Sequence, residues 1–130
     1  MYRLLFERLL SRFDAERMHQ LGFFVLRSLL GLGIVRTWVR AWTSPLDPTL
    51  VVHAFGKVLD SPLGLAAGFD KDAVGYEQLY ALGFGFIEIG TLTGQAQPGN
   101  PKPRMFRFVQ HRALINRLGF NNHGLSLIHI

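Results

Sequence analysis

The chain has 130 residues, of which 48% are hydrophobic, and this is enough apolar material for the core of one ordinary domain. It contains no cysteine, so disulfides, thiolate catalysis and cysteine-ligated metal sites are excluded for this chain. The formal net charge is +5, and most of it falls in residues 1–42, which contain seven arginines and only three acidic residues. Interleaved Leu, Phe and Trp make an anionic membrane surface a better partner than nucleic acid, while an ordinary solvated helix face remains the plainer explanation.

The first forty residues have helical periodicity. Drawn as a helix, residues 2–13 gather leucines and phenylalanines on one side and polar residues on the other, which predicts an amphipathic helix. Asp14 stands where an N-cap belongs, and apolar residues recur at helical spacing until Gly31, which predicts a second helix. A third helix is predicted over Ile34–Trp42.

Neither a membrane span nor a signal peptide is predicted in this region. Arg27 and Ser28 interrupt the apolar run, which is shorter than the roughly 20 residues that a bilayer crossing needs. Charged residues recur throughout, and no small-residue cleavage site follows.

The stretch "TSPLDPT", residues 43–49, predicts a linker because it holds two prolines among polar neighbours. We place a domain boundary there, between a helical module at residues 1–42 and a second unit at residues 50–130. The second unit opens with residues that predict two hairpin strands, and a buried strand is predicted over Leu63–Ala67.

Ala73–Leu82 has helical spacing and ends at Gly83, and "FGFIEIG", residues 84–90, predicts another buried strand. A strand, a helix and a strand of this length make a βα repeat with parallel strands. The long segment "TGQAQPGNPKPRMFRF", residues 93–108, is rich in proline and glycine and follows the C-terminal end of the second strand. In a (β/α) barrel, loops at that end of the strands form the active-site face.

Two further patterns carry little weight. Gly31 and Gly33 have part of the spacing of a dinucleotide-binding loop, but no strand precedes them and the remaining glycine is missing. The histidines show no metal-ligand spacing, so no metal site is predicted.

The stretch "LGLAAGFDKD", residues 63–72, runs from small and apolar residues directly into charged ones. Ala66, Ala67 and Gly68 have almost no side chain, so a flat ring system can lie against their backbone. Lys71 then offers a positive charge suited to a carboxylate, or to the charge that develops on a reduced flavin. Taken alone, a turn with a surface lysine explains the stretch equally well.

The stretch "NRLGFNN", residues 116–122, holds three asparagines after a predicted strand. Because an amide both donates and accepts hydrogen bonds, such a cluster suits a ring that carries amide and carbonyl groups. A structural turn is an equally good explanation of this stretch in isolation.

The four motifs "GLAAGFDKD", "GFIEIGTLT", "QPGNPKPRMFR" and "INRLGFNN", in that order, resemble the dihydroorotate dehydrogenase family, specifically its membrane-associated, quinone-dependent class 2. The resemblance covers residues 61–124 and continues more loosely through "LLSRFDAERMHQLGF" upstream. The soluble class 1 enzymes use fumarate or NAD and lack an N-terminal helical extension, so residues 1–42 argue against that class.

The resemblance implies an α/β fold, a (β/α)8 TIM barrel with FMN at its C-terminal face, preceded by a small helical domain that associates with membrane and forms the quinone entrance. Residues 1–42 match that helical domain. His19 on its second helix is a candidate for the quinone entrance, although a simple interhelix contact is the better-supported role. The implied location is peripheral, at the inner (cytoplasmic) membrane face.

In the family reaction, a base removes a proton from dihydroorotate, a hydride passes to FMN, and the flavin then reduces quinone. The product is orotate, and the reaction is the fourth step of pyrimidine (UMP) biosynthesis. The implied cofactor is FMN, and the implied partners are dihydroorotate, orotate, quinone and a membrane surface, with no nucleic acid.

By the same resemblance, one set of residues binds FMN: Ala67, Gly68, Phe69, Asp70, Lys71 and Thr91. A second set binds the substrate: Lys71, Asn116, Arg117, Leu118, Gly119 and Phe120.

The sequence departs from the family pattern in length. It supplies two barrel strands and the beginnings of more, where the fold takes about 250 residues, so we expect an incomplete barrel. The family's catalytic serine base matches no position here and is expected beyond Ile130, so no catalytic residue is assigned. The expectation is therefore a truncated chain, inactive by itself, whose last residues, 125–130, need not be native. The alternative is a noncatalytic membrane-binding helical module with a vestigial partial barrel.

Overall fold

The computed structural model of the chain describes Phe6 and residues 10–127. The helix predicted over residues 2–13 lies for the most part outside the described residues. At its described end, Leu10–Arg12 forms a single 3-10 turn, η1.

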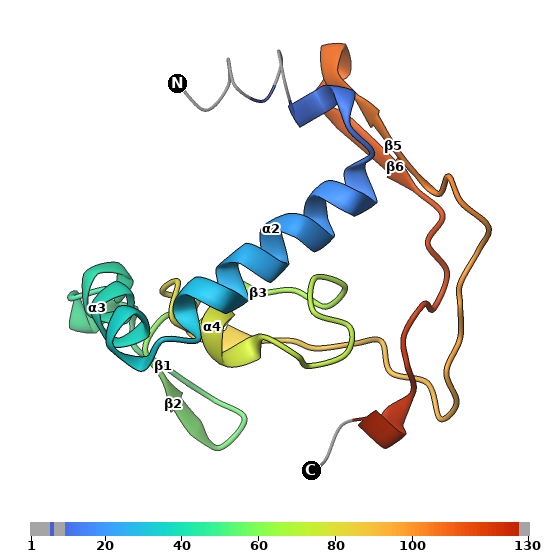
Figure 1. The fold of residues 1–130 in the computed structure, drawn as a ribbon. Coiled ribbons are helices and arrows are strands. Elements are labelled where there is room, and N and C mark those ends of the chain that lie inside the picture. Colours follow the sequence, from blue (N-terminus) through green and yellow to red (C-terminus); the bar gives the residue numbers. More distant parts are fainter. Residues whose placement is uncertain (1–5, 7–9, 128–130) are drawn as a thin grey trace.

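Two helices follow, as the sequence predicted. Helix α2, Ala15–Leu30, begins at Asp14, whose side chain accepts a hydrogen bond of 2.8 Å from the amide of Arg17 and so caps the first turn. It ends at Gly31, whose amide donates to the carbonyl of Arg27. Helix α3, Gly33–Thr43, extends the predicted third helix by one residue at each end. Figure 1 shows α2 as the long diagonal helix of the molecule, with α3 turned away from it.

Helices α2 and α3 expose many apolar side chains. These include Leu21, Phe24, Val25 and Leu29 on α2 and Ile34, Val35, Trp38 and Trp42 on α3, and Leu32 between the helices is exposed as well. No single helix of the described part of the chain is long and apolar enough to cross a membrane. Helices α2 and α3 taken together have the length and the composition of a membrane span. The chain bends by 103° between them, however.

A 3-10 turn, η2, Pro48–Leu50, begins within the predicted linker, and the predicted hairpin follows it. Strands β1, Val52–Ala54, and β2, Lys57–Leu59, pair antiparallel. The connecting residues Phe55 and Gly56 both have positive φ, which is the geometry of the two-residue turn whose twist matches that of the strands.

The βα repeat is confirmed, but its elements are shorter than predicted. Strand β3, Gly64–Leu65, pairs parallel with β4, Phe86–Ile87, and α4, Tyr76–Tyr80, connects them. The prediction of a buried strand over residues 63–67 is wrong, because Leu63 is 63% exposed and Ala66 and Ala67 are exposed as well. Within the described residues β3 pairs with β4 alone, so its other edge and much of its surface remain uncovered.

Residues 93–108, to which the sequence assigned no strand, end in one. Strand β5, Met105–Phe108, pairs antiparallel with β6, Ala113–Asn116, across the short 3-10 turn η3, Val109–His111. The strand β5 is short, and its side chains alternate in burial, as in a sheet that packs on one face. The prolines before it made this alternation hard to recognise in the sequence. The guanidinium of Arg107 donates to the carbonyls of Leu10 and Phe13, and so fastens this hairpin beside the start of α2 (Figure 1).

The described part of the chain therefore has an α/β fold of helices and three separate two-stranded sheets, which confirms the predicted class. The (β/α)8 barrel and the division into two domains stay predictions. Among the described residues, the buried apolar ones are few, namely Ala15, Leu30, Leu79 and Ala81. A last 3-10 turn, η4, covers Leu125–Leu127.

The end of α4 offers a test of this packing. Gly83 has φ +98°, and an added Cβ would lie 2.5 Å from the carbonyl oxygen of Thr43 at the end of α3. We expect Gly83→Ala to destabilise the chain by at least about 2 kcal/mol, since it adds both backbone strain and a clash with rigid backbone. Urea unfolding followed by circular dichroism measures this change.

Gly22→Ala is the matched control, because a Cβ on that residue of α2 meets nothing within 4 Å. It should stabilise the chain by about 0.5–1 kcal/mol through helix propensity. Equal unfolding midpoints for the two variants would show that α3 and α4 do not meet as described.

Candidate functional site

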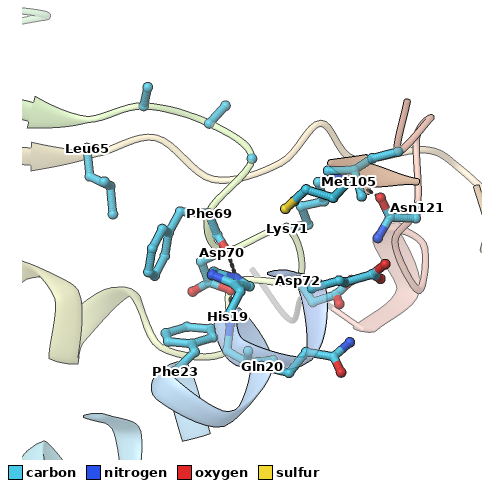
Figure 2. A pocket seen from close by; sticks show the side chains of 16 residues that line it. His19, Gln20, Phe23, Leu65, Phe69, Asp70, Lys71, Asp72, Met105 and Asn121 are labelled. Carbon is cyan, nitrogen blue, oxygen red and sulfur yellow. Dashed lines mark hydrogen bonds between the residues drawn. The ribbon is translucent and has the colours of Figure 1, made fainter. Parts of the chain in front are cut away.

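The small residues of "LGLAAGFDKD" line a cavity of about 510 Å³ (Figure 2). Ala66, Ala67 and Gly68 form part of its wall, and an added Cβ on Gly68 would meet nothing within 4 Å. The backbone of this segment is therefore open to a flat group, as the sequence predicted.

Helix α2 forms a second wall of the cavity. His19 Nε2 lies 3.1 Å from the carbonyl oxygen of Phe69, and the two rings meet edge to face at 4.5 Å. Phe23 packs against the same Phe69 ring at 5.5 Å. His19 thus contacts the turn after β3 rather than a neighbouring helix, and it lines the cavity; its role at a quinone entrance stays a prediction.

Lys71 lies in the polar part of the cavity. Its Nζ donates a hydrogen bond of 2.6 Å to Oδ1 of Asn121, which is fifty residues away in sequence. Burial lowers the pKa of Lys71, and the nearby Arg104 lowers it further, while Glu16 and Asp72 act in the opposite direction. The ammonium is therefore held close to both cationic and anionic neighbours.

The two aspartates beside Lys71 have structural partners. Asp70 is 1% exposed, and its carboxylate accepts hydrogen bonds from the amides of Val74 and Gly75, which closes the turn that leads into α4. Asp72 accepts hydrogen bonds of 2.8 Å from the amide and from Nδ1 of His123. The Asp70 carboxylate is occupied within the turn, although the residue lines the cavity. A contact of Asp70 with FMN, as predicted, would therefore come through its other atoms.

The segment that contains Thr91 lies beside Gly68. The amide of Gly68 donates to the carbonyl of Gly90 at 2.8 Å, so two of the predicted FMN-binding stretches are hydrogen bonded to each other. Thr91 itself is exposed and is not among the residues that line the cavity.

The predicted substrate-binding segment reaches the cavity at one residue, Leu118. Asn116 ends strand β6, and the amide of Arg117 donates to the carbonyl of Arg104 at 2.8 Å. Gly119 and Phe120 are exposed and lie outside the cavity wall. The structure therefore brings residues 67–71 and Leu118 together at one cavity. It leaves five other predicted residues outside the cavity wall, namely Thr91, Asn116, Arg117, Gly119 and Phe120.

A buried ion pair that the sequence did not predict stands behind Lys71. The guanidinium of Arg104 donates to both carboxylate oxygens of Glu16, with distances of 3.0 Å from Nε and 2.6 Å from a terminal nitrogen. The two side chains are only 6% and 11% exposed. The hydrogen bond from Arg104 lowers the pKa of Glu16, and the same contact raises the pKa of Arg104.

Arg104 also connects the loop before β5 with the segment after β6. Its other terminal nitrogen donates to the carbonyls of Pro98 and Asn100. Asn100 in turn donates through its backbone amide to Leu118 and through its side chain to Arg117. The pair thus connects α2 with the substrate-binding segment through a short chain of hydrogen bonds.

Sequence reasoning missed the roles of Glu16, Arg104 and Asn121. Asn121 was counted among the asparagines that face a ring, but its amide oxygen binds Lys71. No spacing rule pairs residues 88 positions apart, and a charged residue in a proline-rich stretch is the only local signal that Arg104 gave. Among the described residues, no group of three or more His, Cys, Asp or Glu side chains could hold a metal ion.

Comparison with known proteins identifies the family. The sequence model described as dihydroorotate dehydrogenase matches residues 49–130. A protein of Leifsonia xyli named dihydroorotate dehydrogenase (quinone) is 56% identical over 126 residues, which cover 95% of this chain and 36% of the relative. A protein of Mycobacterium marinum with the same name is 50% identical over the whole chain and 36% of the relative.

The chain belongs to the dihydroorotate dehydrogenase family. It also resembles in structure the enzyme of this name from Eimeria tenella in complex with ferulenol, with a TM-score of 0.60 and 39% identity over 80% of this chain and 31% of that one. The chain spans about a third of the length of the curated relatives it matches. The resemblance drawn from the four motifs is confirmed.

The contribution of the Glu16–Arg104 pair to the stability of the fold should depend on pH. Because the folded pKa of Glu16 lies below its ordinary value of 4.5, the pair stabilises the fold fully above that value. The contribution is lost as the pH falls through the folded pKa. Glu16→Gln should therefore cost about 3 kcal/mol or more near neutral pH, since it leaves Arg104 buried without its counter-charge, and the difference from wild type should shrink in acid. Urea unfolding at several pH values checks both parts.

Glu77→Gln is the control. Glu77 pairs with Arg36 between α4 and α3, but its side chain is 55% exposed, so the loss should stay below about 1 kcal/mol. Similar losses for the two variants would contradict the assignment of Glu16–Arg104 as a buried anchor.

Proposed function

We propose that this chain forms part of the FMN and substrate site of a quinone-dependent dihydroorotate dehydrogenase, which oxidises dihydroorotate to orotate in pyrimidine biosynthesis. The observation that carries the proposal is the placement of Lys71. Its ammonium stands at the end of a small-residue segment, inside a cavity, and beside the segment that contains Leu118.

The residues present suit FMN. Ala66, Ala67 and Gly68 leave an open backbone on which a flat ring system can rest, and the site has a fixed cation next to it. In this proposal residues 67–71 and Thr91 hold the cofactor. When bound, FMN supplies the two-electron acceptor that the oxidation requires.

Lys71 would act through its charge. An ammonium in a partly buried place stabilises negative charge more strongly than one in open water, because the surrounding dielectric is lower. It can therefore orient the carboxylate of dihydroorotate and stabilise the charge that develops during the oxidation. Within the described residues no serine lines this cavity, so the general base of the reaction would come from outside this wall.

The substrate segment would close the site from the side of β6. Leu118 lines the cavity, and hydrogen bonds from Asn100 and to Arg104 hold its neighbours in place. Residues 116–120 in this proposal contact dihydroorotate, with the amide of Asn116 available to a ring that both donates and accepts hydrogen bonds.

A hybrid enzyme provides the test of this proposal. In it, residues 1–130 replace the matching segment of the Leifsonia xyli relative. Under anaerobic conditions, stopped-flow bleaching of FMN absorbance by dihydroorotate measures the first half of the reaction apart from quinone. A hybrid that binds FMN but is not bleached by dihydroorotate would contradict the proposed function.

In this hybrid we expect Lys71→Ala to slow the bleaching at least about tenfold, equivalent to roughly 1.4 kcal/mol of lost transition-state stabilisation. Lys57→Ala is the control, because Lys57 lies exposed on the β1–β2 hairpin. Lys102 does not serve as a control, since its Nζ lies 3.3 Å from Oε1 of Glu16. Retention of FMN with a wild-type rate in Lys71→Ala would exclude the proposed role.

For residues 1–42 we propose a peripheral membrane surface at the inner, cytoplasmic face, through which quinone reaches the site. Helices α2 and α3 expose apolar residues beside arginines, which is the composition of a helix pair that lies in the headgroup region of a bilayer. His19 and Phe23 extend this surface into the cavity wall, and they are the candidates for contact with quinone.

The membrane surface can be tested by flotation of the chain with phosphatidylglycerol vesicles. Binding should weaken in high salt, because screening reduces the attraction between arginines and anionic headgroups. The double variant Trp38→Ala, Trp42→Ala should bind at least about tenfold less tightly, because both side chains are largely exposed on α3, at 78% and 87%.

Phe55→Ala is the matched control, since Phe55 is 88% exposed but lies on the β1–β2 hairpin. It should bind as the unmodified chain does. Absent binding, or equal loss in both variants, would contradict a membrane surface on α3.

A further inference from the structure

We propose that Asn121 is a positioning residue that holds the Lys71 ammonium at the site. The inference rests on the proposed function, because the place of this ammonium matters only where it meets cofactor and substrate. The two groups are joined by the 2.6 Å hydrogen bond from Nζ to Oδ1, and both side chains line the same cavity (Figure 2).

The ammonium needs such a contact. A lysine side chain has a flexible four-carbon stem, and about 2 kcal/mol of rotamer entropy opposes any single position. The two carboxylates that act on Lys71 are already bound to other groups, Glu16 to Arg104 and Asp72 to His123. The acceptor that the structure gives Lys71 is therefore a neutral amide.

A neutral acceptor has a specific advantage here. A carboxylate in the same place would fix the ammonium but cancel its charge, whereas an amide fixes it and leaves the charge available to an anion. An ammonium has three N–H donors, so the bond to Asn121 leaves two for other acceptors. This arrangement suits a site in which the cation must meet a carboxylate and a ring at once.

Asn121 is itself held in place by its neighbours. The amide of Asn122 donates to the carbonyl of Gln97, and the amide of Gln97 donates back to Asn122, so a bridge fixes the backbone on one side. The Asn122 side chain is buried and its Oδ1 accepts from the amide of Gly124.

On the other side of the contact, His123 is bound twice to Asp72, which adjoins Lys71. Residues 71 and 72 therefore meet residues 121–123 at two points. This two-point pairing orients the amide of Asn121 toward the ammonium, and it gives Asn121 a different role from the ring recognition that its motif suggested.

The hybrid enzyme defined above tests the inference by kinetics. Asn121→Ala should slow the bleaching of FMN by dihydroorotate at least about fivefold, as expected for the loss of one hydrogen bond to a charged group. In the Lys71→Ala background the same change should add little, because a residue that acts through Lys71 has nothing left to position. Gln110→Ala, an exposed amide on η3, should leave the rate unchanged.

A second measurement does not depend on activity. In the hybrid stripped of FMN, acetylation of Lys71 by acetic anhydride, followed by mass spectrometry, reports the fraction of neutral amine. Asn121→Ala removes an acceptor that favours the ammonium, so labelling should become at least about twofold faster. Asn121→Asp places a negative charge against the Lys71 ammonium, whose other charged neighbours are Arg104, Glu16 and Asp72, and it should make labelling slower.

The outcomes separate the two proposals. If the unmodified hybrid binds FMN but is not bleached by dihydroorotate, the proposed function fails, and labelling still decides whether Asn121 controls Lys71. If the hybrid is active but Asn121→Ala keeps its rate, or slows it equally with and without Lys71, the positioning role is wrong. Labelling of Lys71 that does not respond to either substitution would overturn it as well.

Discussion

The arrangement of helix α2 against the rest of the chain depends on the ion pair between Glu16 and Arg104. The guanidinium is nearly fully buried and directs its donors to a carboxylate on α2 and to two carbonyls in the loop before β5. Taking both charges out of water is costly, so the geometry must satisfy each donor, and the loss of either partner would leave an uncompensated buried charge. The carbonyl of Arg104 also accepts from Arg117, so one residue links α2, the loop and the substrate segment.

The same pair sets the electrostatic surroundings of Lys71. Arg104 lowers the pKa of Lys71 and Glu16 raises it, so two opposite charges held together partly cancel at the ammonium. Burial is the larger cause of the lowered pKa. A variant that removes only one member of the pair therefore changes both the position of the loop and the charge that Lys71 experiences, whereas a change at Asn121 acts on the ammonium without removing either charge.

Polar contacts hold the described residues together to an unusual degree, because the apolar interior of this part of the chain is small. Two leucines and two alanines are buried, while large apolar side chains on α2, α3 and both hairpins are exposed. Segments distant in sequence are held instead by hydrogen bonds: Lys71 with Asn121, Asp72 with His123, and Arg107 with the residues before α2. These bonds orient the cavity wall, and the exposed apolar helix pair is the surface we propose for the membrane.

The sequence by itself determined the local elements and the family. Capping at Asp14, helical spacing to Gly31, the two hairpin strands and the glycine after α4 are each properties of neighbouring residues, so they could be predicted without a fold. Four ordered motifs were likewise sufficient to indicate the dihydroorotate dehydrogenase family. Only the tertiary structure decided the short, exposed form of β3, the presence of strand β5 after the prolines, and the partners of Arg104 and Asn121. Burial and pairing depend on segments fifty or more residues apart, and no local periodicity records which of them meet.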